Sequence, residues 1–255
     1  MATTKRADFP IREVAIGYLL SILAAEFLLF FAGQAFAGVI LHSAIVLSLV
    51  VWSSTFGDQE NARTLTALTF ISILRLIAII SPLRFLQPDI QELALAIAML
   101  TVAIIYLNVN NLNFSDIGAK LDFNLTQFGI ALTGIVIGVL LALVDPQPIQ
   151  TELVFPVSVE FFVSFVEVIL FHGILLTTTS KSMGRFAGVM YTSVYYIALF
   201  AIFDYPPAVI AIQFLMNVLF ASARIRTDQL MGVIIAQSIA RVIYIFVAPI
   251  ALTLL

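Results

Sequence analysis

The chain has 255 residues, of which 62% are hydrophobic and only 11% are charged, and its formal net charge is −3. An ordinary soluble domain has about 25% charged residues, so this composition excludes a soluble globular fold and requires lipid around much of the surface. The small net charge says nothing about nucleic acid, but no Lys/Arg run is present, so we expect no nucleic-acid partner. The lack of cysteine excludes disulfides and thiolate chemistry.

Long apolar runs bounded by polar residues, Gly or Pro predict an all-α membrane protein, a polytopic bundle of about eight or nine transmembrane helices. Each span needs about 20 predominantly apolar residues. In chain order the predicted spans are 14–33, 36–54, 64–81, 90–107, 128–144, 157–176, 186–203, 207–223 and 230–254.

The longest polar stretch of the chain, residues 108–126, divides it into two parts. We expect a four-helix membrane region over 1–107, a cytoplasmic connecting segment over 108–126 and a five-helix core over 127–255.

The loops between the predicted spans differ in their content of Lys and Arg. Cytoplasmic loops carry the excess of basic residues. If the N-terminus is cytoplasmic, Arg84 is the only basic loop residue on the outer side of the membrane. The basic residues on the cytoplasmic side are then Lys5, Arg6, Arg12, Arg63, Lys120, Lys181, Arg185, Arg224 and Arg226. The bias predicts that the N-terminus is cytoplasmic and that the C-terminus lies on the outer side.

Two charged residues in the N-terminal spans are expected to pair. An ionisable residue at the bilayer centre costs about 2.5–3.5 kcal/mol, so it needs a partner inside the bundle. Glu26 in the first span and Arg75 in the third span lie at nearly the same depth. We expect a Glu26–Arg75 pair that acts as a structural clamp; the alternative is a polar site for an ion or a lipid headgroup.

A second set of charges lies in the C-terminal spans. Glu167 and Arg241 have matching depths, Gln237 lies one turn from Arg241, and Glu160 lies on a similar face of the helix to Glu167. We expect a Glu167–Arg241 pair. His172 stands about 140° around an α-helix from Glu167, so a structural role is expected for this histidine.

Three short motifs resemble those of a known family. Glu-Val-Ile-Leu-Phe-His-Gly at 167–173 resembles E-E-x-x-F-R-G, the segment 196–200 resembles F-x-x-x-H, and 237–241 resembles H-x-x-x-N. With a lead-in at 113–118, and a further similarity at 74–82, the chain over 113–245 resembles the CAAX-protease and bacteriocin-processing family (CPBP, or Abi) of intramembrane glutamate proteases.

The resemblance implies a CPBP-like core in the C-terminal half, but most of the family's catalytic positions are replaced. Only the first glutamate is kept, and the six positions in family order are occupied by Glu167, Val168, His172, Phe200, Gln237 and Arg241. A glutamate locked against an arginine is a poor general base. We therefore assign a catalytic role to none of these residues, and we expect no metal and no cofactor.

These observations predict a catalytically inactive scaffold or subunit that binds another membrane protein in the plasma membrane of a prokaryote. The first alternative is an endopeptidase with an altered catalytic set around Glu167 and His172. The second alternative is a transporter or binding protein for a small solute or lipid. Gly134 and Gly138 form a small-x-x-x-small pattern that indicates close helix packing or a partner interface.

Overall fold

The computed structural model describes residues 10–80, 85–120, 122, 124–149, 154–200, 205–247 and 249. Within these residues the chain is helical and contains no strand. The elements are α1 (Ile11–Phe30), α2 (Ala35–Thr55), α3 (Gln59–Ile80), α4 (Pro88–Val109), η2 (Phe114–Ile117), α5 (Leu125–Val144), α6 (Val154–Val168), η3 (Ile169–Leu175), α7 (Leu176–Met183), α8 (Arg185–Phe200), α9 (Pro207–Thr227), α10 (Met231–Val242) and η4 (Ile243–Val247).

The predicted polytopic helical bundle is confirmed. Elements α6, η3 and α7 form one continuous helix of 30 residues, and η4 continues α10. Counted in this way, the described residues form nine long helices that coincide with the nine predicted spans. Seven of them are long and apolar enough to cross a membrane, while α8 and the α10–η4 helix are shorter. Helices suit this environment because each one satisfies its own backbone hydrogen bonds.

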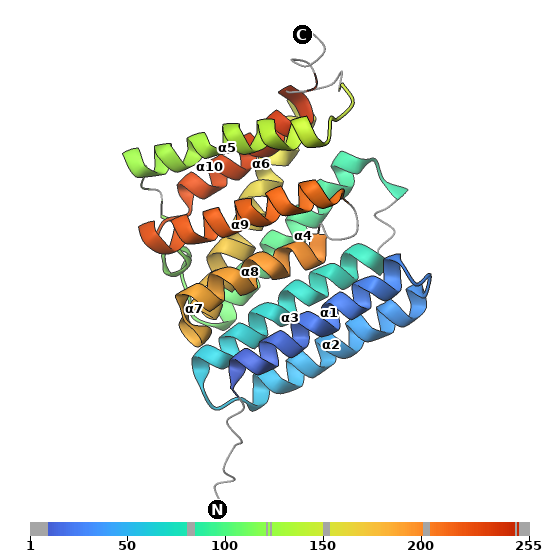
Figure 1. Cartoon of the computed structure of the whole chain (residues 1–255). Coiled ribbons are helices and arrows are strands. Elements are labelled where there is room, and N and C mark those ends of the chain that lie inside the picture. Colours follow the sequence, from blue (N-terminus) through green and yellow to red (C-terminus); the bar gives the residue numbers. More distant parts are fainter. Residues whose placement is uncertain are drawn as a thin grey trace, which may run out of the picture.

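Successive long helices run in alternate directions across the bundle (Figure 1). The start of α1 and the end of η4 therefore lie on opposite faces. The face that holds the start of α1 also holds the helix ends that carry basic residues, which are Arg12, Arg63, Lys181, Arg185, Arg224 and Arg226. We call it the basic face; its orientation toward the cytoplasm stays a prediction, and Arg84, the predicted exception, lies outside the described residues.

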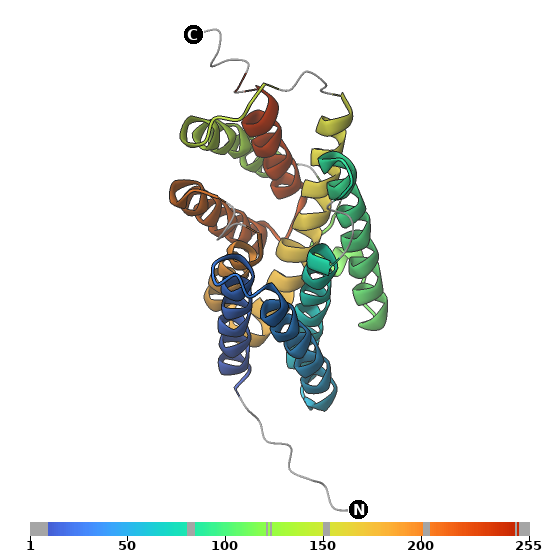
Figure 2. The same cartoon turned by 90° about the vertical axis from the view of Figure 1, so that its right-hand side faces the viewer.

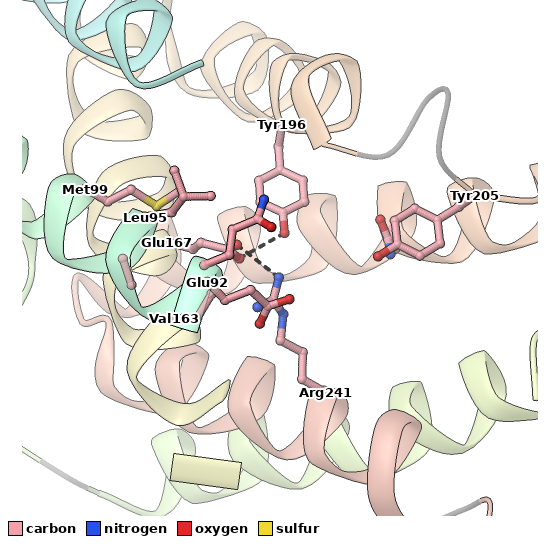
Figure 3. A pocket seen from close by; sticks show the side chains of 11 residues that line it. Glu92, Leu95, Met99, Val163, Glu167, Tyr196, Tyr205 and Arg241 are labelled. Atoms are coloured by element: carbon pink, nitrogen blue, oxygen red, sulfur yellow. Dashed lines mark hydrogen bonds and ion pairs between the residues drawn. The ribbon is translucent and has the colours of Figure 1, made fainter. Parts of the chain in front are cut away.

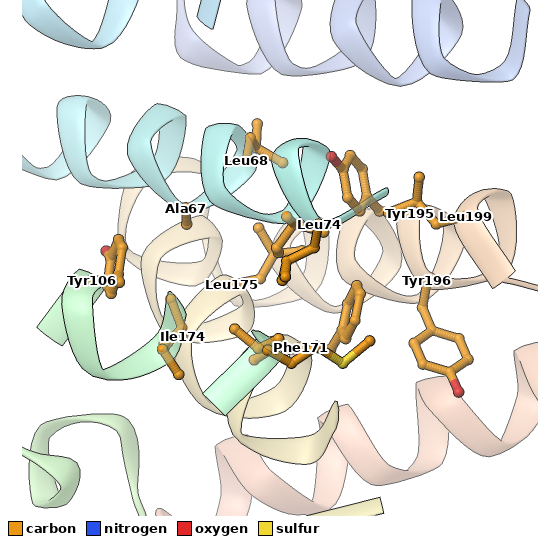
Figure 4. Packing of buried hydrophobic residues seen from close by; sticks show 14 of the residues in the cluster. Ala67, Leu68, Leu74, Tyr106, Phe171, Ile174, Leu175, Tyr195, Tyr196 and Leu199 are labelled. Carbon is orange, nitrogen blue, oxygen red and sulfur yellow. The ribbon is translucent and has the colours of Figure 1, made fainter. Parts of the chain in front are cut away.

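The helices on both sides of the connecting segment share one hydrophobic core. Helices α1–α3 lie at one end of the molecule and α5 with α10 at the other, with α8 and α9 between them (Figures 1 and 2). Side chains of α3, such as Leu68 and Leu74, pack with Phe171 and Leu175 of η3 and with Tyr195 of α8 (Figure 4). The C-terminal helices that carry the protease-like motifs are thus held by the N-terminal ones.

The glycines of α5 pack against α10. A Cβ atom at Gly134 would lie 2.2 Å from the carbonyl oxygen of Ala236, and one at Gly138 would lie 2.7 Å from that of Ala240. Because real Cβ atoms do not approach a carbonyl so closely, only glycine allows this helix spacing. The small-residue pattern therefore serves an internal contact in this chain, and these two glycines do not offer a face to a partner.

The segment between α4 and α5 is anchored on α9 and α10. Gly118 has a φ of +83°, which favours glycine. The side chain of Arg224 donates from Nε to the carbonyl oxygen of Ile117 at 3.2 Å, and the backbone N–H of Leu230 donates to that of Gly118 at 2.9 Å. These bonds fix the connecting segment against the C-terminal helices on the basic face.

Candidate functional site

The carboxylate of Glu167 is the centre of a polar network inside the C-terminal helices. Its side chain is only 4% exposed, at the end of α6. Glu167 Oε2 accepts hydrogen bonds from Tyr196 Oη at 3.0 Å and from Gln237 Nε2 at 2.8 Å. Glu167 Oε1 accepts from Arg241 Nη2 at 3.0 Å. Both carboxylate oxygens are thus bound by groups from two other helices, α8 and α10 (Figure 3).

Arg241 joins a second carboxylate to the first. Its Nη1 donates to Glu160 Oε2 at 3.2 Å while Nη2 binds Glu167. Glu160 and Glu167 lie seven residues apart on α6, which places them on one face of the helix, as expected from the sequence. A guanidinium with a planar fork of donors suits two acceptors, and each charge is less costly in the membrane when it is paired.

The two remaining positions of the first motif do not join this network. Val168 is completely buried and packs among apolar residues such as Phe220 and Val233. His172 is 1% exposed, and neither of its ring nitrogens has a hydrogen-bond partner in the described part of the chain. Its ring lies edge-on to Phe220 of α9, with the ring centroids 6.4 Å apart. The structure therefore gives no hydrogen bond between His172 and Glu167.

A π-helix separates these two residues, which the sequence did not indicate. The chain changes from α6 to the π-helix η3 at Ile169, directly after Glu167 and Val168. It changes again from α10 to the π-helix η4 at Ile243, directly after Arg241 and Val242. A π-turn shifts every later side chain around the helix axis, so the angle of 140° between Glu167 and His172 does not apply. Such turns are frequent at functional sites.

The network borders a cavity of about 320 Å³ between α4, α6, α8, α9 and α10 (Figure 3). Its apolar lining residues come from α4 and α6 and are Leu95, Ala96, Met99 and Val163. Its polar lining residues are Gln91, Glu92, Glu167, Tyr196, Tyr205, Gln213 and Arg241. Because Glu92 is exposed and Glu167 is buried, the cavity runs from the surface of the bundle to the network.

Sequence reasoning missed several residues of this site. Glu92 lies close to the start of the fourth predicted span and was not counted among the intramembrane charges, although Glu160 lies near the same end of its own span. Tyr196 stands at the phenylalanine position of the motif at 196–200, which gives no sign of a polar role, but its hydroxyl donates to Glu167. The signal that could have found both residues is their depth, which matches that of the charges already identified.

The position that corresponds to the family's first histidine is only partly described. Phe200 is the last residue of α8, and its side chain lies outside the described residues. Among the described residues, no group of three or more His, Asp or Glu side chains has a geometry that could hold a metal ion.

A second charged cluster lies in the N-terminal helices. Arg75 of α3 donates from Nε and Nη2 to the two oxygens of Glu26 of α1, both at 2.7 Å. His42 Nε2 of α2 is 3.2 Å from Glu26 Oε1. Glu26 and His42 are completely buried, and the Phe30 ring lies 5.7 Å from the Arg75 guanidinium carbon. The pair expected from matching depths is thus in direct contact, and a histidine joins it.

Comparison with known proteins identifies one region of the chain. Residues 149–243 match the family described as type II CAAX prenyl endopeptidase Rce1-like. This range contains the three motifs but begins after the lead-in at 113–118. No curated protein and no solved structure matches the chain.

Proposed function

We propose that this chain, whose residues 149–243 match the Rce1-like CAAX prenyl endopeptidase family, is a non-catalytic relative that serves as a membrane scaffold or subunit and binds another membrane protein. The observation that carries the proposal is the set of three hydrogen bonds that the two oxygens of Glu167 accept, from Tyr196, Gln237 and Arg241.

Water activation needs a base with a free acceptor atom within hydrogen-bond reach of the water. Glu167 has Arg241 on one oxygen and two neutral donors on the other, so both oxygens already receive hydrogen bonds from the protein. Gln237 stands at a histidine position, and an amide does not take up a proton. His172, the one histidine of the C-terminal helices, is buried against Phe220 and makes no hydrogen bond to Glu167 within the described residues.

The packing of the C-terminal helices supports the scaffold role. Helices α5 and α10 pack closely through Gly134 and Gly138, while Glu167, Gln237 and Arg241 at the motif positions bind one another. A fold that keeps its packing without a free catalytic base is suited to binding through its surface. The partner that we infer is another integral membrane protein, because apolar side chains cover the exposed faces of α1, α2 and α5.

The test has two readouts on the full chain. The first is cleavage of a prenylated CAAX peptide by membranes that contain the wild-type chain, with Glu167→Gln and membranes without the chain as controls. We expect no cleavage above the controls. Cleavage that Glu167→Gln abolishes would contradict the proposal and support a peptidase with an altered catalytic set.

The second readout is native mass spectrometry of tagged protein purified from its own membranes in mild detergent. We expect a second protein in stoichiometric amount. A chain that is recovered only as a monomer or homodimer contradicts the scaffold role. A double variant, Glu167→Gln with Arg241→Met, should keep the partner if the network has only a structural role.

A further inference from the structure

The cavity next to Glu167 carries more negative than positive groups. Glu92 and Glu167 line it, and Arg241 is the one guanidinium among the described residues that do so. Arg241 already binds Glu167 and a third carboxylate, Glu160, which lies beside the cavity and does not line it. Glu92 therefore adds a second lining carboxylate to a cation whose two donor groups are already in use.

A buried hydroxyl on the same helix face lacks a partner. Ser164 is completely buried, and within the described residues its Oγ makes no hydrogen bond. It stands four residues after Glu160 and three before Glu167, so it lies on the same face of α6 as both carboxylates. A buried polar atom without a partner is uncommon in a folded protein, and this one lies in the helix turn between the two glutamates, behind the residues that line the cavity.

The cavity also has the shape and walls of a ligand site. Its volume of about 320 Å³ falls within the range of small-molecule pockets, about 300–1,000 Å³. Leu95 and Met99 give the cavity apolar lining, and Tyr196 and Tyr205 add aromatic rings to it. Aromatic faces attract organic cations. Glu92 lies one turn from the start of α4, at the face opposite the basic face, so the entrance is at the depth of lipid headgroups.

We propose that this cavity binds an organic ammonium group with a short apolar substituent, with Glu92 as its charged acceptor. The ligand is either a free small amine or the amine of a lipid headgroup, since both present the same chemistry. The proposal goes beyond the scaffold role and does not depend on it, because the cavity and its charges are independent of any partner protein.

The test uses the purified full chain in detergent and measures thermal stabilisation by hexylammonium, with hexanol as the neutral counterpart. We expect the melting temperature to rise with hexylammonium concentration and to reach a plateau. Hexanol should have only a weak effect without a plateau. In Glu92→Gln the affinity for hexylammonium should fall at least tenfold, because a charge-assisted contact is lost. The matched control is Asp89→Asn, which removes the same charge from the same helix at a residue that does not line the cavity.

Several results would overturn the proposal. Equal effects of hexylammonium and hexanol on the wild-type chain would show that the cavity does not select a cation, and this comparison needs no variant to fold. An unchanged affinity in Glu92→Gln, or an equal loss in Asp89→Asn, would assign the binding to another place or to surface charge.

The two sources of the amine are separated in lipid nanodiscs. Weaker hexylammonium binding in phosphatidylethanolamine discs than in discs of an uncharged glycolipid without an amine, such as monoglucosyl diacylglycerol, would support the lipid headgroup as occupant. Equal binding in both lipids would support a free amine. Neither peptidase activity nor a partner protein affects the binding of hexylammonium to the purified chain. A failure of this proposal can therefore be distinguished from a failure of the proposed function.

Discussion

The two charged clusters of this protein use similar residues in different surroundings. Glu26 and Arg75 form a bidentate pair in which the carboxylate is completely buried. Glu160, Glu167 and Arg241 form a network with an excess of carboxylate that borders a cavity. A sealed pair of opposite charges can only hold helices together, whereas an unbalanced network with access from outside can meet a ligand. Charge balance and access therefore distinguish a structural clamp from a candidate site.

Removal of the cation from the sealed cluster should have the largest effect. Arg75→Met leaves the buried Glu26 carboxylate without its partner, which should reduce the free energy of unfolding by about 3–5 kcal/mol. The measurement is unfolding in mixed micelles. The control is the double variant Glu26→Gln with Arg75→Met, which should recover most of the stability. If the single variant is as stable as the wild type, the pair is not a clamp.

A methyl group at the α5–α10 contact should have the next largest effect. Gly134→Ala places a Cβ atom against the backbone of Ala236, which cannot move aside as a side chain can. We expect a loss of about 3 kcal/mol, the upper end for overpacking. The matched control is Gly129→Ala on the same helix, where no atom lies within 4 Å of the added carbon. Equal stability of the two variants would show that α5 and α10 can separate at little cost.

Removal of the cation from the open network should cost less than in the sealed cluster. Arg241→Met leaves Glu160 and Glu167 without a counterion, but the cavity can admit water or a proton to them. We expect a loss of about 1–3 kcal/mol, measured by the same unfolding assay as for Arg75→Met. A loss larger than that of Arg75→Met would reverse the comparison between the two clusters.

Removal of the exposed ion pair between Lys120 and Asp228 on the basic face should have the smallest effect on stability. The hydrogen bond from Lys120 lowers the pKa of Asp228 from its ordinary value near 3.8, and the charge of Arg224 adds to this, although partial burial opposes it. The stabilisation is therefore present above the ordinary pKa and is lost as the pH falls through the lowered one. Because Asp228 is 67% exposed, the effect should stay below about 1 kcal/mol.

The measurement compares the melting temperature of the wild-type chain with that of Asp228→Asn between pH 6 and pH 3. The difference between the two should shrink below about pH 4, near the ordinary pKa of aspartate. A difference that grows as the pH falls would contradict the direction of the pKa shift.

The sequence by itself determined the helical bundle, its spans and the depth of its charged residues. A helix rises 1.5 Å per residue and a membrane has a fixed thickness, so counting from the end of a span gives the depth of each side chain. This is why Glu26 with Arg75, and Glu167 with Arg241, could be matched before any contact was known. The order of the three protease-like motifs also follows from the sequence alone.

Only the tertiary structure decided which side chains meet at each depth. Lateral position depends on how helices pack and rotate, and a π-turn after Glu167 changes the direction of His172 without any sign in the local sequence. Helix packing also places the backbone of Gly134 against α10, and it brings Glu92 and Tyr196 together at the cavity next to Glu167. Depth is a property of one helix, whereas a site belongs to several helices at once.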